Sequence, residues 1–580
     1  MILLDTVFER TLDAWVQAYC APAWRGARLE GWLFEAPQAR REAETRLARA
    51  GVAARLRSAY KPLLHHFLEE VDAAGLLRAT VRYPLHPQAA PNRYTLEAYP
   101  LAALLAGVDV AFEAGGPELL APLRYRVALH YAGGRVEEHD VFAPNLLADG
   151  PDGPALSPTG WLRLTDAQGA LRHDAAVRTE YQAVFDAALQ CVRAQPWRDE
   201  PYFERLQLRA DIPAIEFALD VDEALVSTCE ALHEDLYFSL LEHFQRLSGR
   251  PPGDRGLQPG QIVPDVRPHA GPARLRIAAL PFEPAAADAP APLPRPLEET
   301  DAPLAPAHIA GQMAALGGWP FQALSRQGRP VLGTYFAGPG PAVLISAGQH
   351  ANETSGVVGA LRAAHVLRAG GDAHFALIAA ENPDGYALHR QYCTVHPRHM
   401  HHAARYSALG DDVAYREREP RREQQARIDA LALSGARLHV NLHGYPAHEW
   451  TRPLSGYLPR HFELWTLPKG FFLVMRHHAG WRAQAERLVE RVTAQLARVP
   501  GLVAFNARQT ALFEAHAGRR GFDLVNGIAV TLGESDREMA PLALLTEFPD
   551  ETVYGERFRF AHTVQCATVL AAVQAYRAGL

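Results

Sequence analysis

Two histidines and a glutamate are spaced so that they could hold one metal ion. His350 and Glu353 lie three residues apart in GQHANETSG, directly after a short apolar run and at the predicted start of a helix. At that spacing both side chains can reach one ion. His443, in NLHGY, follows another apolar run 93 residues later (443 minus 350). Two imidazoles and a carboxylate with an open fourth position form the ligand set of a catalytic zinc ion, so we predict Zn²⁺ at these three residues.

Glu547 could supply the base that such a hydrolase needs. It stands in LLTEFP at the end of a later apolar run. Zinc lowers the pKa of its water and polarises a carbonyl, and a neighbouring carboxylate can take the proton and pass it to the leaving nitrogen. The segment ENPDGYALHR, residues 381–390, reads as a loop after a further apolar run. Its Asn382, Asp384 and Arg390 are candidates for binding substrate.

Only a folded sheet could bring these residues together. Downstream of residue 306, short apolar runs alternate with helix-like segments, which is the pattern of an α/β fold with a mostly parallel sheet flanked by helices. In such sheets, ligands bind outside the carboxyl ends of the strands, where the polar residues above fall. The predicted strands are residues 341–347, 374–380, 436–442, 528–532 and 542–548, and the predicted helices are residues 354–368, 421–433, 480–498 and 556–578.

The order of these motifs resembles the zinc carboxypeptidase family typified by carboxypeptidase A, and its neighbouring branch of succinylglutamate desuccinylases and aspartoacylases. An HxxE pair, an NPDG segment, a histidine at a strand end and a late glutamate follow one another between about residues 338 and 547. The resemblance is limited to the C-terminal part of the chain. It implies a mixed, mostly parallel sheet, zinc on His350, Glu353 and His443, and Glu547 as general base. The implied reaction is hydrolysis of an amide bond next to a free carboxylate, in a peptide or an amino-acid conjugate.

Two features of the family's carboxypeptidases are missing or altered here. Their Asn-Arg clamp for the substrate carboxylate would fall in RQYCTVHPRHMHHAARY, where Arg390, Arg398 and Arg405 are all candidates and Arg398 is our first choice. Bidentate recognition of a carboxylate favours a guanidinium. Their mobile tyrosine has no counterpart between Asn506 and Glu547, so an assisting phenol would have to come from elsewhere, for example Tyr445 or Tyr457.

The sequence alone also allows two other functions. The separation of 93 residues between His350 and His443 is shorter than in typical carboxypeptidases and closer to the deacylase branch, which keeps an N-acyl-amino-acid deacylase as the alternative. The altered arginine and tyrosine positions also permit a non-catalytic binding protein with a degenerate site, whose N-terminal half would recruit a partner.

Several other histidines compete for the metal. His439 lies four residues before His443 and would face the same side of the strand, but Gly444 after His443 matches the family's strand end, so we assign His439 to the core. The cluster of His396, His399, His401 and His402 could chelate a metal by itself. We favour a loop that lines the substrate cleft or is exposed, because adjacent histidines converge only when the fold forces them.

The chain divides at a segment rich in proline and alanine, residues 283–306, which favours an extended connector. We predict an α+β domain of unassigned role at residues 1–282 and the zinc domain at residues 307–580. Upstream of the connector, residues 125–142 predict a hairpin that turns at Gly133 and Gly134. Residues 220–247 predict a helix with acids between its apolar positions; we favour a solvated acidic face over binding of a cation or basic partner.

Composition excludes some classes of protein. With 48% hydrophobic and 21% charged residues and a net charge of −7, the chain is an ordinary globular protein and not a strongly basic nucleic-acid binder. No apolar run approaches the roughly 18 residues of a membrane span. The five scattered cysteines form no CxxC pair, which fits a reducing compartment, so we expect a cytoplasmic protein. The composition predicts no particular oligomeric state.

Overall fold

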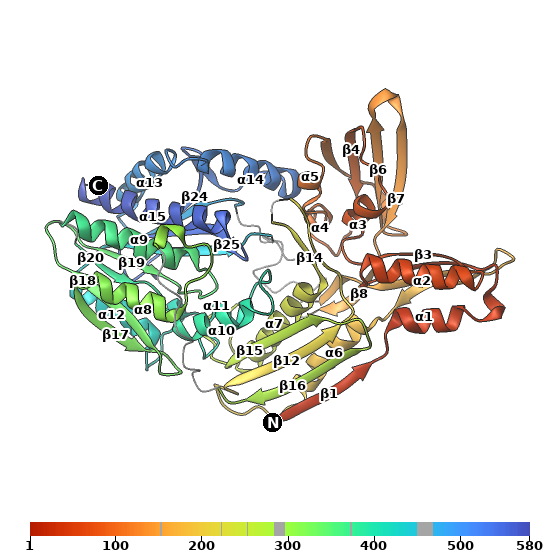
Figure 1. Cartoon of the computed structure of the whole chain (residues 1–580), viewed down its shortest axis with the longest axis horizontal. Coiled ribbons are helices and arrows are strands. Elements are labelled where there is room, and N and C mark those ends of the chain that lie inside the picture. The colour runs from red at the N-terminus through yellow and green to blue at the C-terminus, as the bar shows by residue number, and fades with distance from the viewer. Residues whose placement is uncertain are drawn as a thin grey trace.

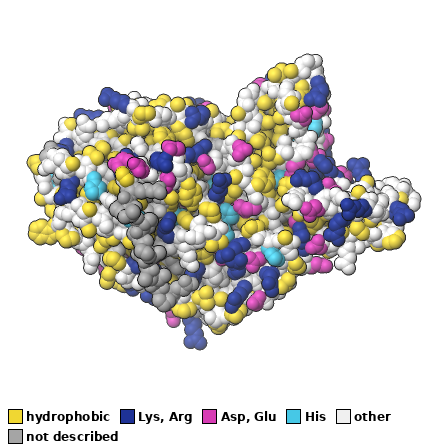
Figure 2. All heavy atoms as spheres, in the orientation of Figure 1, with side chains coloured by type: hydrophobic (Ala, Val, Ile, Leu, Met, Phe, Trp, Pro, Cys, Tyr) yellow, Lys and Arg dark blue, Asp and Glu magenta, His cyan; other side chains and the backbone are white. Residues whose placement is uncertain are grey.

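The computed structural model describes residues 1–150, 153–221, 223–251, 253–282, 296–371, 374–448 and 468–579. Residues 283–295 of the predicted connector lie outside these residues; the rest is not a simple extended linker, because it contains a short 3-10 helix (Leu297–Glu299) with Leu297 buried and the first residue of the helix Pro306–Leu316. In Figure 1 the C-terminal half forms the rounded body on the left, and elements of the N-terminal half extend to the right. On the face in Figure 2, cationic and anionic side chains are interspersed over the N-terminal elements. Within the described residues, no helix is both long and apolar enough to cross a bilayer.

A mixed sheet of nine strands forms the centre of the C-terminal half, in the order β17-β18-β20-β19-β21-β25-β22-β24-β23. Its four central strands, β20, β19, β21 and β25, run parallel, and antiparallel pairings predominate on either side. The predicted α/β class and mixed sheet are confirmed. The strands are β17 (Trp319–Leu324), β18 (Pro330–Phe336), β19 (Val343–Ala347), β20 (Phe375–Ile378), β21 (Leu438–Pro446), β22 (Phe472–His477), β23 (Asp523–Val525), β24 (Ile528–Glu534) and β25 (Leu542–Glu551).

Helices cover both faces of this sheet. Along β19, Val343 and Ile345 join the core formed with the helices α9, α13 and α15, whereas Leu344 joins the core formed with α12. This alternation is what a strand buried on both faces requires. The helices of this half are α8 (Pro306–Leu316), α9 (Ser355–Gly370), α10 (Pro383–Cys393), α11 (His402–Arg405), α12 (Glu423–Ser434), α13 (Arg482–Leu496), α14 (Leu502–Ala517) and α15 (Glu556–Arg577).

The sequence missed several elements, and one prediction was wrong. The strands β17, β18, β22 and β23 and the helices α8, α11 and α14 were not predicted. The segment 381–390 is not a loop, because α10 begins at Pro383. The side chain of Asn382 accepts a hydrogen bond from the backbone N–H of Gly385 (2.9 Å), and Pro383 occupies the first helical position. Both are strong signals for the start of a helix, so NPDG forms a helix cap and not a turn.

The N-terminal half contains three four-stranded sheets. The hairpin predicted at residues 125–142 is confirmed as β6 and β7, with its turn at Gly133 and Gly134. The first sheet has β1 (Ile2–Phe8), β16 (Ala273–Leu280), β12 (Arg205–Ile212) and β15 (Gln261–Pro268); the second has β11 (Leu171–Val177), β10 (Gly160–Thr165), β2 (Arg28–Leu33) and β3 (Ala53–Ser58); the third has β5 (Asp109–Ala114), β4 (Leu76–Tyr83), β6 (Arg124–Tyr131) and β7 (Val136–Phe142).

Helices and short hairpins complete this half. The helices are α1 (Thr11–Tyr19), α2 (Pro37–Arg49), α3 (Pro62–Glu69), α4 (Arg93–Glu97), α5 (Leu101–Leu104), α6 (Glu180–Arg193) and α7 (Thr228–Leu247), and the hairpins are β8 (Asn145–Gly150) with β9 (Gly153–Pro158) and β13 (Glu216–Ala218) with β14 (Leu225–Ser227).

The helix α7 is buried, contrary to the solvated acidic face expected for it. All residues from Thr228 to Leu240 are buried, and carboxylates of α7 and its neighbours pair with histidines of the C-terminal half. These pairs are Asp265 with His396 (2.8 Å), Glu216 with His399 (2.9 Å), Glu234 with His402 (3.1 Å) and Glu230 with His448 (2.6 Å). Buried carboxylates need such partners. The acidic pattern of α7 therefore encodes an interface between the two halves, which the sequence does not reveal.

We expect the pair of Glu230 and His448 to make this interface sensitive to acid. Burial alone would raise the pKa of Glu230, but His448 and the backbone N–H of Met400 outweigh it and hold that pKa below its usual value of 4.5. A carboxyl group whose pKa is lower in the folded state than in the unfolded state stabilises the fold above pH 4.5. This stabilisation is lost as the pH falls further. Glu230→Gln should cost about 1–3 kcal/mol at pH 7 and flatten the decline of the thermal midpoint between pH 5 and pH 3, measured by circular dichroism.

The control for this variant is Glu486→Gln. Glu486 also forms an ion pair, with Arg482, but its side chain is 53% exposed, and exposed pairs contribute little. The prediction is wrong if Glu230→Gln and Glu486→Gln show the same dependence on pH as the wild type.

Candidate metal centre

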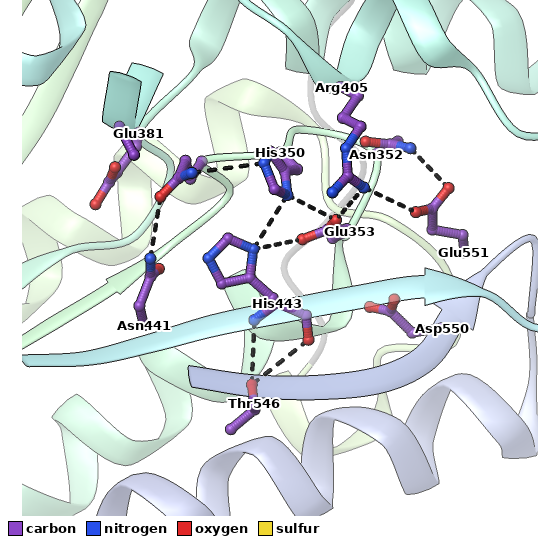
Figure 3. A network of polar contacts seen from close by, with 12 residues as sticks. His350, Asn352, Glu353, Glu381, Arg405, Asn441, His443, Thr546, Asp550 and Glu551 are labelled. Carbon is purple, nitrogen blue, oxygen red and sulfur yellow. Dashed lines mark hydrogen bonds and ion pairs between the residues drawn. The ribbon is translucent and has the colours of Figure 1, made fainter. Parts of the chain in front are cut away.

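His350, Glu353 and His443 converge in the C-terminal half. His350 Nδ1 lies 2.8 Å from Glu353 Oε1, His443 Nδ1 lies 2.9 Å from Glu353 Oε2, and the two Nδ1 atoms lie 3.1 Å apart. All three residues are buried. Atoms at these separations can share one zinc ion at the roughly 2.0–2.2 Å of Zn–N and Zn–O bonds. The donor set, two imidazoles and one carboxylate, therefore fits Zn²⁺ (Figure 3).

The elements that carry these ligands are adjacent in the sheet. His350 and Glu353 lie in the turn between β19 and α9, and His443 lies on β21, which pairs in parallel with β19. Thr546 Oγ1 accepts a hydrogen bond from the backbone N–H of His443 (3.1 Å), and Gln565 donates to its carbonyl (2.9 Å). The backbone around His443 is thus fixed from two neighbouring elements, β25 and α15.

Gly444 follows His443 because no side chain fits there. A Cβ atom at position 444 would lie 1.9 Å from Asp550 Oδ1. Asp550 in turn accepts a hydrogen bond from the backbone N–H of Ser355 at the start of α9 (2.7 Å). The contact of Gly444 with Asp550 therefore brings β21, β25 and α9 together at the metal ligands.

Asp412, which the sequence analysis missed, holds the outer nitrogen of His350. Its Oδ2 atom lies 3.4 Å from His350 Nε2, and its Oδ1 atom accepts a hydrogen bond from Gln349 Nε2 (2.9 Å). A carboxylate on the far nitrogen of a metal-binding histidine fixes the orientation of the ring and raises its basicity. The only sequence signal was the acidic pair GDD after the histidine-rich segment.

The surrounding protein shifts the pKa values of the two histidines in opposite directions. Burial lowers the pKa of His443, so its imidazole is neutral, as a ligand requires. Burial also acts to lower the pKa of His350, but Glu353 and Asp412 outweigh it and raise that pKa. A metal ion bound to His350 would therefore displace a proton, which makes binding weaker in acid.

Of the three candidate arginines, Arg405 contacts the ligand group. Its NH1 atom donates to Glu353 Oε1 (2.7 Å) and lies 4.0 Å from Glu551 Oε1, and its side chain is 23% exposed. Arg398, the first choice from sequence, is exposed, and the described structure records no contact between it and the metal ligands. Arg390 donates to the carbonyl of Pro303 (2.9 Å) and lines a separate cavity of about 610 Å³ beside α8 and α10.

Glu547 lies on β25 directly across from His443 in the parallel register. It is partly exposed, and no hydrogen bond joins its carboxylate to another described residue. Burial by the surrounding protein and the negative charge of Glu353 raise its pKa well above the usual range, against the opposing effect of Arg405. A carboxylate that is not tied to a partner can exchange a proton with a substrate or a water molecule.

The other predicted substrate-binding residues use their polar atoms within the protein. Asn382 caps α10 and donates to the carbonyl of Tyr406 (2.9 Å), and Asp384 accepts hydrogen bonds from Ser325 and Arg329 (2.8 Å each). The hydroxyl of Tyr445 is buried and donates to the carbonyl of Gly470 (2.6 Å). Tyr457 lies outside the described residues. The described contacts thus give these three side chains structural partners.

The rival histidines lie away from the metal ligands. His439 Nε2 contacts Ser346 Oγ (2.7 Å) in the core, as predicted. A second convergent group, His389, Cys393 and His401, forms a chain of contacts: Cys393 Sγ to His389 Nε2 (3.3 Å), His389 Nδ1 to His401 Nδ1 (2.9 Å) and His401 Nε2 to the carbonyl of His396 (2.9 Å). Each ring nitrogen has a partner, and burial lowers the pKa of His389 to about 3. The hydrogen-bonding atoms of His389, Cys393 and His401 thus have partners within the protein and need no metal ion.

Comparison with known proteins gives matches only among solved structures. No protein-family model matches the chain, and no curated protein matches it. A metallo-carboxypeptidase from Burkholderia cenocepacia is 16% identical, with 75% of this chain and 96% of that chain covered and a TM-score of 0.29. A metallo-carboxypeptidase from Pseudomonas aeruginosa is 13% identical, with 53% and 72% covered and a TM-score of 0.29. At these values the similarity does not bear on activity, which has to be argued from the residues of the chain itself.

We expect the purified wild type to contain about one zinc per chain, measured by plasma mass spectrometry. The double variant His350→Ala, His443→Ala should lose it, because only one protein ligand would remain. His439→Ala is the matched control, since His439 lies on the same strand but contacts Ser346; it should retain the metal. Zinc that persists undiminished in the double variant would refute the ligand assignment.

Proposed function

We propose that this chain is a zinc-dependent metallocarboxypeptidase, which hydrolyses an amide bond next to a free carboxylate. The observation that carries the proposal is the buried convergence of His350 Nδ1, His443 Nδ1 and the Glu353 carboxylate at 2.8–3.1 Å. Glu547 and Arg405 flank this group. A set of three protein ligands, two imidazoles and one carboxylate, is typical of a hydrolytic zinc centre and not of a structural one.

Each residue has a chemical task in this proposal. A zinc ion held by the three ligands would lower the pKa of a water molecule and polarise the substrate carbonyl. Glu547 accepts the proton of the attacking water on its carboxylate and donates it to the leaving nitrogen. Arg405, the guanidinium nearest to the ligands, is suited to stabilise negative charge on the carbonyl oxygen or to bind the substrate carboxylate.

The second candidate is an N-acyl-amino-acid deacylase that uses the same zinc site. The separation of 93 residues between His350 and His443 favours this branch of the resemblance. Both reactions break an amide bond, so they differ only in which side of that bond the protein recognises.

Glu547→Gln should leave zinc bound and remove turnover, because the amide cannot accept a proton. We expect kcat to fall by about 10²–10⁴-fold, the usual contribution of a general base, with the zinc content unchanged by mass spectrometry. Glu534→Gln, at an exposed glutamate on β24, is the matched control and should keep full activity. A fully active Glu547→Gln variant would remove Glu547 from the mechanism.

A comparison of three substrates separates the two reactions. A metallocarboxypeptidase should cleave a peptide with a free C-terminal carboxylate at least about 100-fold faster than its C-terminal amide, because the amide leaves a charged recognition group unpaired. A deacylase should instead prefer an N-succinyl amino acid. Hydrolysis is followed by chromatography, with and without a chelator. Chelator-sensitive cleavage of any of the three substrates would refute the remaining alternative, a non-catalytic binding protein with a degenerate site.

A further inference from the structure

A loop of the N-terminal half, residues 253–260, lies against the segment that carries Asp412. Three hydrogen bonds join them. The backbone N–H of Asp412 donates to the carbonyl of Arg255 (3.0 Å), the side-chain amide of Gln258 donates to Asp411 Oδ2 (2.9 Å), and the backbone N–H of Gly260 donates to the carbonyl of Leu409 (2.8 Å). The segment from residue 409 to residue 412 is therefore held along its length by the N-terminal half.

The same loop contributes charge to Asp412. Arg255 NH1 lies 3.8 Å from Asp412 Oδ2, the atom that faces His350 Nε2 at 3.4 Å. The Asp412 side chain is only 1% exposed, so neighbouring protein groups and not solvent must balance its charge. Within the C-terminal half, Gln349 and the backbone N–H of Ala414 bind the other carboxylate oxygen.

The two segments approach more closely than side chains would permit. Gly410 has a φ of +85°, and a Cβ atom at this position would lie 2.4 Å from the carbonyl oxygen of Gly260. A contact under 3.0 Å with backbone cannot be relieved by rotating a side chain. Glycine at position 410 thus allows the backbone of one half to rest directly on the backbone of the other, two residues from Asp412.

We propose that loop 253–260 is a positioning element of the metal centre, which fixes Asp412 and through it the imidazole of His350. The inference rests on the zinc site proposed above and gives the N-terminal half a role in that site. Residues that orient a metal-binding histidine from outside typically change metal affinity by about 10–100-fold when they are lost. Here the support for such a residue comes from a loop about 150 residues earlier in the chain.

The test is the zinc affinity of full-length variants, measured by competition with a chromophoric chelator. Gly410→Ala should force the two loops apart and weaken zinc binding by about 10-fold, and Asp412→Asn should weaken it by about 10–100-fold. If the loop acts through Asp412, the double variant should bind zinc within about 2-fold of Asp412→Asn alone, because neighbouring effects on one group do not add. A purely structural defect would add to the loss from Asp412→Asn.

Two further variants keep the test decisive. Gly435→Ala is the control for backbone strain: Gly435 also has a positive φ, +64°, but a Cβ atom there meets nothing within 4 Å, so zinc affinity should not change. Gln258→Ala removes the contact with Asp411 without any backbone strain and should weaken zinc binding by about 2–5-fold, a fraction of the loss expected for Asp412 itself. It replaces Gly410→Ala if circular dichroism shows that the latter does not fold.

The outcomes are distinguishable. Wild-type protein that binds no zinc overturns the proposed function, and this inference with it. Zinc binding by the wild type together with unchanged affinity in folded Gly410→Ala and Gln258→Ala overturns only the role of the loop. The role of the loop is also overturned if Gly410→Ala lowers zinc affinity in the Asp412→Asn background as much as it does in the wild type, because the loop would then not act through Asp412.

Discussion

The burial of the charged and polar metal-ligand groups is the constraint on which the rest of the structure depends. These groups lie near the carboxyl ends of the parallel strands β19, β21 and β25. His350, Glu353 and His443 are each buried, and a buried charged group is stable only if others pair with it. The register of β21 with β19 and β25 brings the ligands together. The burial of the ligands then determines which residues must surround them.

A connected polar network meets this requirement. Gln349 Oε1 accepts hydrogen bonds from Arg427 (2.8 Å) and Asn441 (3.0 Å), while its amide donates to Asp412. Arg427 is itself paired with Glu381. A fully satisfied network of this kind is rigid, and it holds His350 on the side of the ring opposite Nδ1, the atom proposed to bind the metal. Rigid ligands that are oriented in advance are what a hydrolytic metal site needs.

The same constraint explains how the two halves are joined. The segment between α10 and α12 carries Arg405 and Asp412, and its histidines pair with carboxylates of the N-terminal half. From the sequence we favour a cleft-lining or exposed loop for this histidine cluster, but His396, His401 and His402 are buried, and His396, His399 and His402 pair with acids of the N-terminal half. Because His396, His399 and His402 each meet an acid from a distant part of the chain, the segment has one position relative to the metal ligands.

The sequence by itself determined the central strands, the helices α9, α12, α13 and α15, and the candidate ligands His350, Glu353 and His443, because apolar periodicity and local spacing are properties of neighbouring residues. The sequence also contains the signals for a helix cap at Asn382, although we interpreted residues 381–390 as a loop. Only the tertiary structure decided that Arg405 and not Arg398 reaches Glu353, that Asp412 faces His350, and that the acids of α7 are buried. These are contacts between residues 52 to 218 positions apart, and no local pattern encodes which partner such a side chain will meet.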